Sequence, residues 1–108
     1  GGTNRKCTAS RLKTYISGSS VDSSFSDGDT VGSDINLVDA SGGNITVKVP
    51  ENSDSGTQYI IKKTDSSSNT VTISRTTADT IDGSASKVLY HQYETLTVVS
   101  DGSNWHII

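Results

Sequence analysis

The sequence predicts an all-β fold, a small antiparallel β-sandwich or meander of about 7–8 short strands over residues 35–108. Two observations predict it. The aliphatic residues are mostly β-branched, with nine Val and nine Ile against four Leu, and 14 Thr add to the residue types that strands favour. Short apolar stretches also alternate with polar residues between turns rich in Gly, Asn, Asp and Ser. The 108 residues suffice for one small domain with a thin core.

The chain is predicted to divide into an N-terminal arm, residues 1–34, and a β-rich domain, residues 35–108. Residues 8–16 of the arm predict a short helix, with Gly18 as its stop. Its apolar positions fall on one face at helical spacing: Ala9, Leu12, Tyr15 and Ile16. Two helical turns are too few to be stable alone, so this stripe is expected to pack on the body or on a neighbouring subunit.

Residues 17–34 are predicted to be a polar linker or surface loop, because seven Ser, three Gly and four Asp stand among eighteen positions. Val21, Phe25 and Val31 are candidates for attaching this loop to the body. The four Asp residues suggest a loop for a hard cation, but the spacing of a calcium loop is missing. We therefore expect a solvated acidic loop and no metal or other cofactor.

The predicted strands follow at short, regular spacing. Their ranges are 35–39, 45–49, 58–63, 70–74, 80–82, 87–90, 94–99 and 105–108. The Gly-rich residues 41–44 and the polar residues 64–69 are each expected to close a hairpin between the flanking strands. Pro50 ends a strand because it has no N–H to donate, and residues 101–104 form the last turn.

Positive charge is concentrated in the arm. Arg5, Lys6, Arg11 and Lys13 precede the first acidic residue, whereas residues 14–108 carry five basic and twelve acidic groups, a net charge of −7. Together with the apolar stripe, these charges predict an assembly or anchoring arm made of Arg5, Lys6, Arg11, Leu12, Lys13, Tyr15 and Ile16. An exposed tether with solubilising charges is the alternative. Nucleic acid is not an expected partner, because no aromatic residues alternate with these charges.

Several functional classes lack their signals. The single Cys7 cannot form an internal disulfide, and no apolar run is long enough to predict membrane insertion. Ser is abundant, and His91 and His106 are present, but no G-x-S-x-G elbow accompanies them, so both His are expected to be surface or packing residues. The sequence therefore predicts a protein that is not an enzyme. A chain that starts at Gly1 and contains no Met is expected to be a fragment or a processed product.

Aromatic residues offer one further candidate contact. Tyr93 and Trp105 could stack on a sugar ring or on another subunit, because an aromatic face gives apolar contacts to a pyranose. Few aromatic residues are available to fill the core, so packing is the favoured role of Trp105.

The order of short motifs along the chain resembles a β-rich module that is widespread in tailed-bacteriophage virion proteins, notably tail fibres and related tail components. The motifs that carry the resemblance lie at residues 1–3, 8–12, 38–50, 59–65, 69–73, 80–83, 92–94 and 99–105. The resemblance implies a structural component of the virion, a homotrimer, and contacts with tail, portal, collar or capsid proteins. Two alternatives stay open: a capsid decoration or head-fibre protein, and an adhesin module that binds a host-surface glycan.

Overall fold

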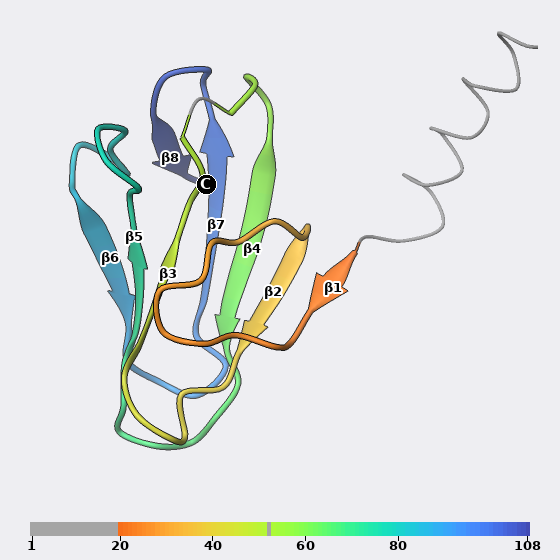
Figure 1. Cartoon of the computed structure of the whole chain (residues 1–108), viewed down its shortest axis with the longest axis vertical. Helices are drawn as coiled ribbons and strands as arrows, with labels where there is room; N and C mark the ends of the chain where they lie inside the picture. The colour runs from red at the N-terminus through yellow and green to blue at the C-terminus, as the bar shows by residue number, and fades with distance from the viewer. Residues whose placement is uncertain (1–19, 52) are drawn as a thin grey trace, which may run out of the picture.

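All regular structure among the described residues is β-strand. The computed structural model describes residues 20–51 and 53–108, which form eight strands (Figure 1). In chain order these are β1 Val21–Asp22, β2 Ile35–Val38, β3 Ile45–Lys48, β4 Gln58–Lys63, β5 Val71–Ser74, β6 Ser86–Leu89, β7 Thr95–Ser100 and β8 Trp105–Ile107. The predicted all-β class is confirmed, whereas the helix predicted over residues 8–16 lies outside the described residues.

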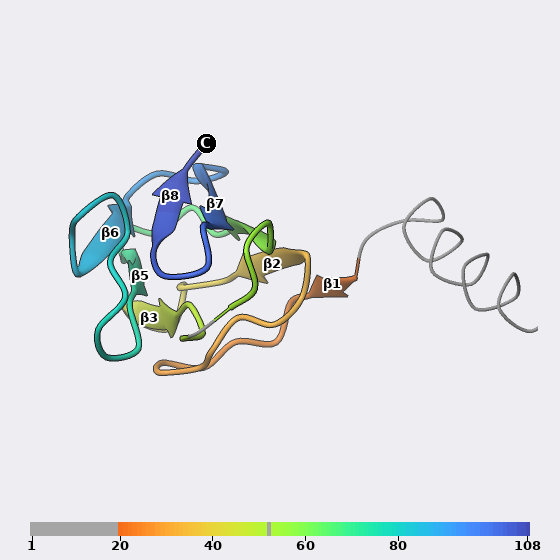
Figure 2. The same ribbon diagram turned by 90° about the horizontal axis from the view of Figure 1, so that it is seen from above.

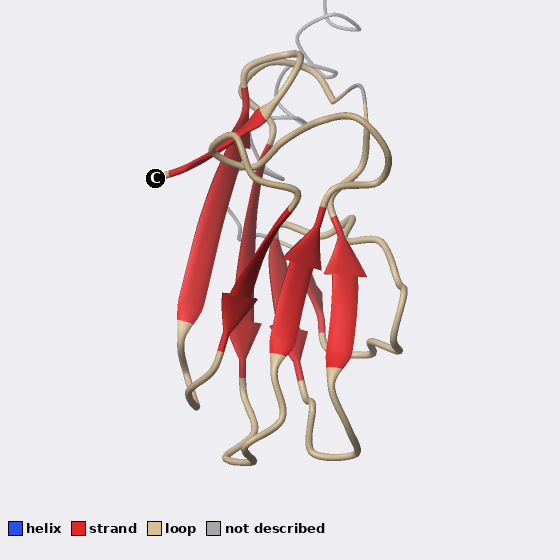
Figure 3. Cartoon of the chain, turned by 90° about the vertical axis from the view of Figure 1, so that its left-hand side faces the viewer, coloured by secondary structure: helices blue, strands red, loops and turns tan. Residues whose placement is uncertain are grey.

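The strands form two sheets that pack face to face (Figures 2 and 3). One sheet has five strands in the order β1-β2-β4-β7-β8, and the other has three in the order β3-β5-β6. The β1–β2, β2–β4 and β3–β5 pairs are parallel, and the β4–β7, β7–β8 and β5–β6 pairs are antiparallel. The expectation of antiparallel sheets is therefore wrong, because each sheet is mixed.

Three connections at one end of the molecule join strands of opposite sheets, at the bottom of Figure 1. Residues 39–44 join β2 to β3, residues 64–70 join β4 to β5, and residues 90–94 join β6 to β7. We call each strand–loop–strand unit an arch. The hairpins predicted around residues 41–44 and 64–69 are thus wrong, because the strands that flank each loop pair with other strands rather than with one another.

Contacts between neighbouring loops explain why arches form. The Asn69 side-chain amide donates to the Ala40 carbonyl at 2.7 Å, and the Asp65 carboxylate accepts the Ala40 N–H at 2.8 Å. These side chains therefore bond to the backbone of the adjacent loop, in addition to the local bond that Asp65 accepts from the Ser67 N–H. The first two arches also share a pattern, Asp-x-Ser at residues 39–41 and 65–67, and their second strands pair in parallel.

Other parts of the predicted chain path are confirmed. β3 ends at Lys48, shortly before Pro50, and the turn at residues 101–104 joins β7 to β8 with Ser100 opposite Trp105. The short piece predicted at residues 80–82 makes only isolated bridges, in which Ile81 pairs with Ser84 and with Trp105.

The core lies between the sheets and receives side chains from both. Its buried apolar residues are Val31, Val38, Ala40, Val47, Val49, Ile61, Val71, Ile73, Ile81, Leu89, Val98 and Trp105. Val31 and the partly buried Phe25 attach the polar loop to this core, whereas Val21 is 57% exposed. The same loop covers the outer edge of β3, because the Gly28 N–H donates to Thr46 and the Lys48 N–H donates to Asp29.

The tight turn before β6 gives a test of backbone strain. Asp82 and Gly83 have φ of 48° and 79°, and Ile81 and Ser84 exchange two backbone hydrogen bonds across them. We expect Gly83→Ala to lower the free energy of unfolding by about 1 kcal/mol, because a side chain disfavours this left-handed conformation. Urea unfolding followed by circular dichroism measures the loss.

Gly32→Ala is the matched control for this substitution. An added Cβ meets nothing within 4 Å at either glycine, but Gly32 does not have the positive φ of Gly83. We therefore expect Gly32→Ala to leave stability unchanged or to raise it slightly. Equal losses in the two variants would contradict the strain argument.

Candidate functional site

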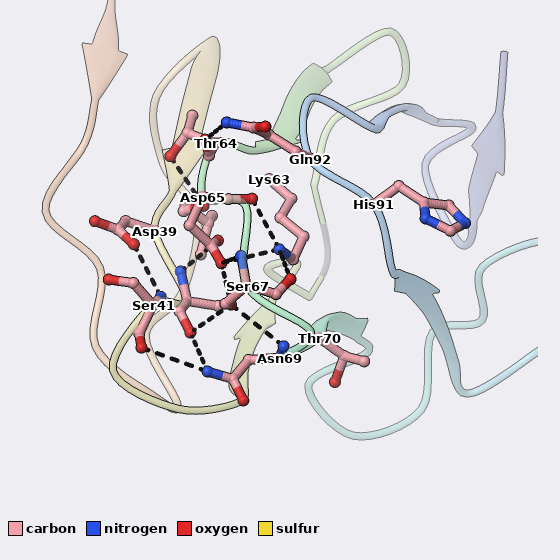
Figure 4. Close-up of polar contacts among 12 residues, drawn as sticks. Asp39, Ser41, Lys63, Thr64, Asp65, Ser67, Asn69, Thr70, His91 and Gln92 are labelled. Carbon is pink, nitrogen blue, oxygen red and sulfur yellow. Dashed lines mark hydrogen bonds and ion pairs between the residues drawn. The ribbon is translucent and has the colours of Figure 1, made fainter.

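The most highly connected polar cluster lies at the arch end of the sandwich (Figure 4). The side chain of Lys63, the last residue of β4, is fully buried, and its Nζ lies 2.9 Å from the Asp65 carboxylate. The same ammonium donates to the backbone carbonyls of Asp65 and Ser67, each at 3.0 Å. The buried charge thus has three oxygen partners, as a lysine at this depth requires.

The Asp65 carboxylate is the centre of this cluster. Its side chain is 5% exposed, and it accepts hydrogen bonds from the Ser67 hydroxyl and the backbone N–H groups of Ala40 and Ser67. Burial raises the pKa of Asp65. Hydrogen bonds from Ser67, Lys63 and the backbone outweigh burial and hold that pKa well below its usual range. The carboxylate is therefore an ionised structural acceptor.

The third arch is bound to the same place. The Tyr93 N–H donates to the Lys63 carbonyl at 2.6 Å, the Lys63 N–H donates to the Glu94 carbonyl at 3.0 Å, and the Gln92 amide donates to the Thr64 carbonyl at 3.2 Å. Residues 63–69 of the second arch therefore contact the loops of both the first and the third arch. The arrangement chemically suits a rigid joint between three loops, with its charged groups already paired inside the protein.

Sequence reasoning missed Lys63 and Asp65. A signal was present, because Tyr59, Ile61 and Lys63 alternate on one face of β4, and that face meets the core. A lysine at such a position needs a carboxylate nearby, and Asp65 follows two residues later.

The two aromatic candidates are separated by the fold. Trp105 is fully buried, its ring centroid lies 5.5 Å from that of Tyr59, and its Nε1 donates to the Pro50 carbonyl at 3.2 Å. Tyr93 is 62% exposed, and the Lys62 ammonium lies 5.3 Å from its ring centroid. A shared stacking platform of Tyr93 and Trp105 is therefore not formed, and of these two residues Tyr93 is the one whose ring is open to a partner.

Tyr93 has an unusual backbone. Its φ is 66°, in the left-handed region where residues other than Gly, Asn and Asp are uncommon. The 2.6 Å hydrogen bond of its N–H and a bond from the Thr95 hydroxyl to its carbonyl hold this conformation. The fold thus fixes the position of an exposed ring at the arch end.

The histidines occupy separate surface positions. His106 lies between two carboxylates, with Nε2 2.7 Å from Asp101 and Nδ1 3.7 Å from Asp82. His91 is exposed, and its N–H donates to the Glu94 carboxylate, whose pKa is lowered mainly by the N–H groups of Tyr90 and His91. Hydrogen bonds from the Asn104 N–H, from His106 and from the Ser103 N–H lower the pKa of Asp101 to about 2.

The lowered pKa of Asp101 predicts a contribution to acid stability. Because the folded pKa lies below the ordinary value of 3.8, the contribution is expected to be complete above about pH 4 and to be lost as the pH falls toward 2. A carbon-detected NMR titration of the carboxyl measures the pKa directly. His106→Ala should raise it only in part, since the backbone donors remain. A midpoint near pH 4 in the original chain would contradict this prediction.

The acidic loop uses its carboxylates internally. Asp22 accepts the Ser24 N–H, Asp29 accepts the Ser26 N–H, and Asp34 accepts the Ser20 N–H. Asp27 accepts the N–H of Thr46 across the loop at 2.8 Å. Within residues 20–51 and 53–108, no group of three or more His, Cys, Asp or Glu side chains is arranged to hold a metal ion.

The remaining candidates lie outside the described residues. They are Cys7 and the predicted anchoring arm of Arg5, Lys6, Arg11, Leu12, Lys13, Tyr15 and Ile16. In the part of the chain that the structure describes, no helix is long and apolar enough to cross a membrane.

Comparisons with known proteins add no assignment. No protein-family model matches the chain, and a search of curated proteins found no significant match.

Proposed function

We propose that this chain is a non-enzymatic structural component of a bacteriophage virion, as a tail-fibre or tail-associated module that acts in particle attachment or assembly. The observation that carries the proposal is the joint between the three arches. Side chains and backbone groups of residues 63–69 bind the loops on both sides, so the end of the sandwich is braced by contacts that are distant in sequence. A braced β-module of this kind suits a protein whose task is to hold a shape.

Two sequence features support the placement in a particle. The ordered motifs that resemble phage virion modules cover most of the two-sheet body, from Val38 to Trp105. The basic residues Arg5, Lys6, Arg11 and Lys13 precede residues 14–108, which carry a net charge of −7, so the two parts offer charges of opposite sign to neighbouring subunits. In this proposal the arm anchors the module to the particle, and three copies assemble through their bodies.

Labelling of intact particles tests the proposal. Antibodies raised against the recombinant full chain are applied to virions of the phage that encodes it, and gold-conjugated secondary antibodies locate them by electron microscopy. Gold on the tail or its fibres is the expected result. Gold on the head would favour the capsid decoration or head-fibre alternative. Absence of the protein from purified virions, checked by mass spectrometry, would overturn both.

Glycan binding is a second candidate, and the exposed Tyr93 favours it. Its ring is held in place beside Lys62, and Tyr90 in the same connection is 58% exposed. Tyr93→Ala should abolish binding on a glycan array while leaving the circular dichroism spectrum unchanged. Ser68→Ala, at an exposed position in the neighbouring second arch, is the control that should keep binding. An array without any hit for the original chain would refute this candidate.

A further inference from the structure

The outer faces of the two sheets differ in chemistry. The outer face of the three-stranded sheet is mainly polar, with Thr46, Lys48, Thr72, Ser74, Ser86 and Val88. The outer face of the five-stranded sheet, which we call the apolar face, carries six apolar residues, Val21, Ile35, Leu37, Ile60, Val99 and Ile108, beside the polar Gln58, Lys62, Thr95, Thr97 and His106. None of these six belongs to the core or to the residues packed against it. The second sheet thus presents an apolar surface that the described residues leave partly open.

Strand register makes this surface continuous. Val21 pairs with Ile35 and Ile35 with Ile60, so that one apolar row crosses β1, β2 and β4. The row continues through Thr97, which pairs with Ile60, to Ile108, whose N–H donates to the Thr97 carbonyl. Val21 and Ile108, at the two ends of the row, are 57% and 67% exposed. An apolar row that crosses a sheet, interrupted here at Thr97, is typical of a surface that another element covers.

The chain itself supplies an element of matching chemistry at the edge of this face. The described residues begin at Ser20, which is bonded to Asp34 beside β1, and β1 is the edge strand of the five-stranded sheet. The predicted stripe of Ala9, Leu12, Tyr15 and Ile16 ends at Ile16, and four residues separate it from Val21. Connections of about 2–6 residues commonly join a helix to the sheet on which it packs.

Reach and charge agree with this assignment. Four residues span about 13 Å when extended, whereas β4 lies two strand spacings of about 4.8 Å from β1. Residues 5–13 carry four basic groups and no acidic group, and Asp34 is exposed at the margin of the face where the chain enters. A contact between segments so close in sequence also has a small loop-closure cost.

We propose that the apolar face is the docking surface for the N-terminal segment of the same chain, with the stripe of Leu12 and Ile16 lying over Ile35 and Ile60. Docking covers the apolar row and leaves Arg11 and its basic neighbours at the margin of the contact. This inference is independent of where the protein functions, because it follows from the two sheet faces and from the point at which the chain enters β1.

Disulfide trapping in the full-length chain tests the proposal. In a Cys7→Ser background, Leu12→Cys is combined with Ile60→Cys or with Ile35→Cys, on the apolar face. The matched control combines Leu12→Cys with Thr72→Cys, which lies in the middle strand of the polar sheet as Ile60 lies in the middle strand of the other. Disulfide formation requires Cα atoms within about 7 Å, so it reports on proximity.

We expect a disulfide within one chain at Ile60 or Ile35, formed about tenfold faster than at Thr72 and at a rate independent of protein concentration. Equal rates on the two sheets, or no disulfide on the apolar face, would overturn the proposal. Disulfide-linked dimers whose formation rises with concentration would also overturn it, because they would show that another copy covers the face.

A dye that binds exposed apolar surface gives a second measurement. Leu12→Asp with Ile16→Asp should uncover the face and increase the fluorescence of anilinonaphthalene sulfonate several-fold. The control of equal charge is Ser10→Asp with Thr14→Asp, two positions off the predicted stripe, which should leave the fluorescence unchanged. Equal dye binding by the two double variants and the original chain would contradict docking by the stripe.

Discussion

Asp65→Ala is expected to lower the free energy of unfolding by about 3–5 kcal/mol, because it leaves the buried Lys63 ammonium without its counter-charge. Removal of the carboxylate also deprives the Ala40 and Ser67 N–H groups of their acceptor. The loss therefore acts on two arches at once. Urea unfolding of the full chain, followed by the fluorescence of Trp105, measures it.

Asp39→Ala is the matched control. Asp39 opens the first arch as Asp65 opens the second, but it is exposed, and its carboxylate accepts the Ser41 N–H. We expect a much smaller loss for Asp39→Ala than for Asp65→Ala, because the Asp39 carboxylate is exposed to solvent and has no buried counter-charge. Equal losses for the two variants would show that the buried pair carries no special stability.

A double variant separates the burial of charge from the loss of contacts. Lys63→Met with Asp65→Ala removes both charges and leaves an apolar side chain of similar length in the core. Because the ammonium no longer needs a partner, the double variant should be more stable than Asp65→Ala alone. The single variant Lys63→Met completes the comparison. If the stability lost in the double variant equals the sum of the losses in Lys63→Met and Asp65→Ala, the two residues act independently, and the interpretation of Lys63 as a buried, paired charge is wrong.

The fold class could be predicted from the sequence, but the connections between strands could not. Alternation at Ile45, Val47 and Val49 identifies a half-buried strand whatever its partner is, because alternation describes only two faces. Whether residues 64–69 turn back or cross to the other sheet depends on where the Asp65 and Asn69 side chains bond. Both reach Ala40, more than twenty positions away, so local turn chemistry gives no indication of it.

Pairs of apolar residues that are adjacent in the sequence indicate that some apolar side chains lie on an outer face. Ile60 and Ile61, like Val98 and Val99, are adjacent in the sequence, so one residue of each pair must lie on the outer face of its strand. Strict alternation with polar residues, as in Thr72 of β5, is typical of an outer face in solvent. Val88 and Leu89 form the same kind of pair in the three-stranded sheet, so the pairs alone do not distinguish the two sheets, and only the register shows that the outer apolar residues of the five-stranded sheet form one row.

Trp105→Ala is expected to lower the free energy of unfolding by about 3–5 kcal/mol, the range for removal of a large aromatic side chain from a core. Trp105 is the largest of the fully buried side chains among the described residues. Its ring packs against Tyr59, and its backbone pairs with the segment around Ile81. Circular dichroism in urea measures the effect, because this variant has no tryptophan fluorescence.

Tyr93→Ala is the surface control, because its ring is 62% exposed. The expected change in stability is within about 0.5 kcal/mol. Loss of glycan binding in Tyr93→Ala would therefore report on a contact, whereas the same loss in Trp105→Ala would report on unfolding.

Trp105→Phe divides the Trp105 effect into its packing and hydrogen-bonding parts. Phe keeps an aromatic ring beside Tyr59 but lacks the indole N–H that donates to the Pro50 carbonyl. We expect a loss between that of Trp105→Ala and zero, because a smaller ring leaves a cavity and the Pro50 carbonyl loses its donor. If Trp105→Phe is as destabilising as Trp105→Ala, the bond to Pro50 contributes more to stability than the packing of the ring does.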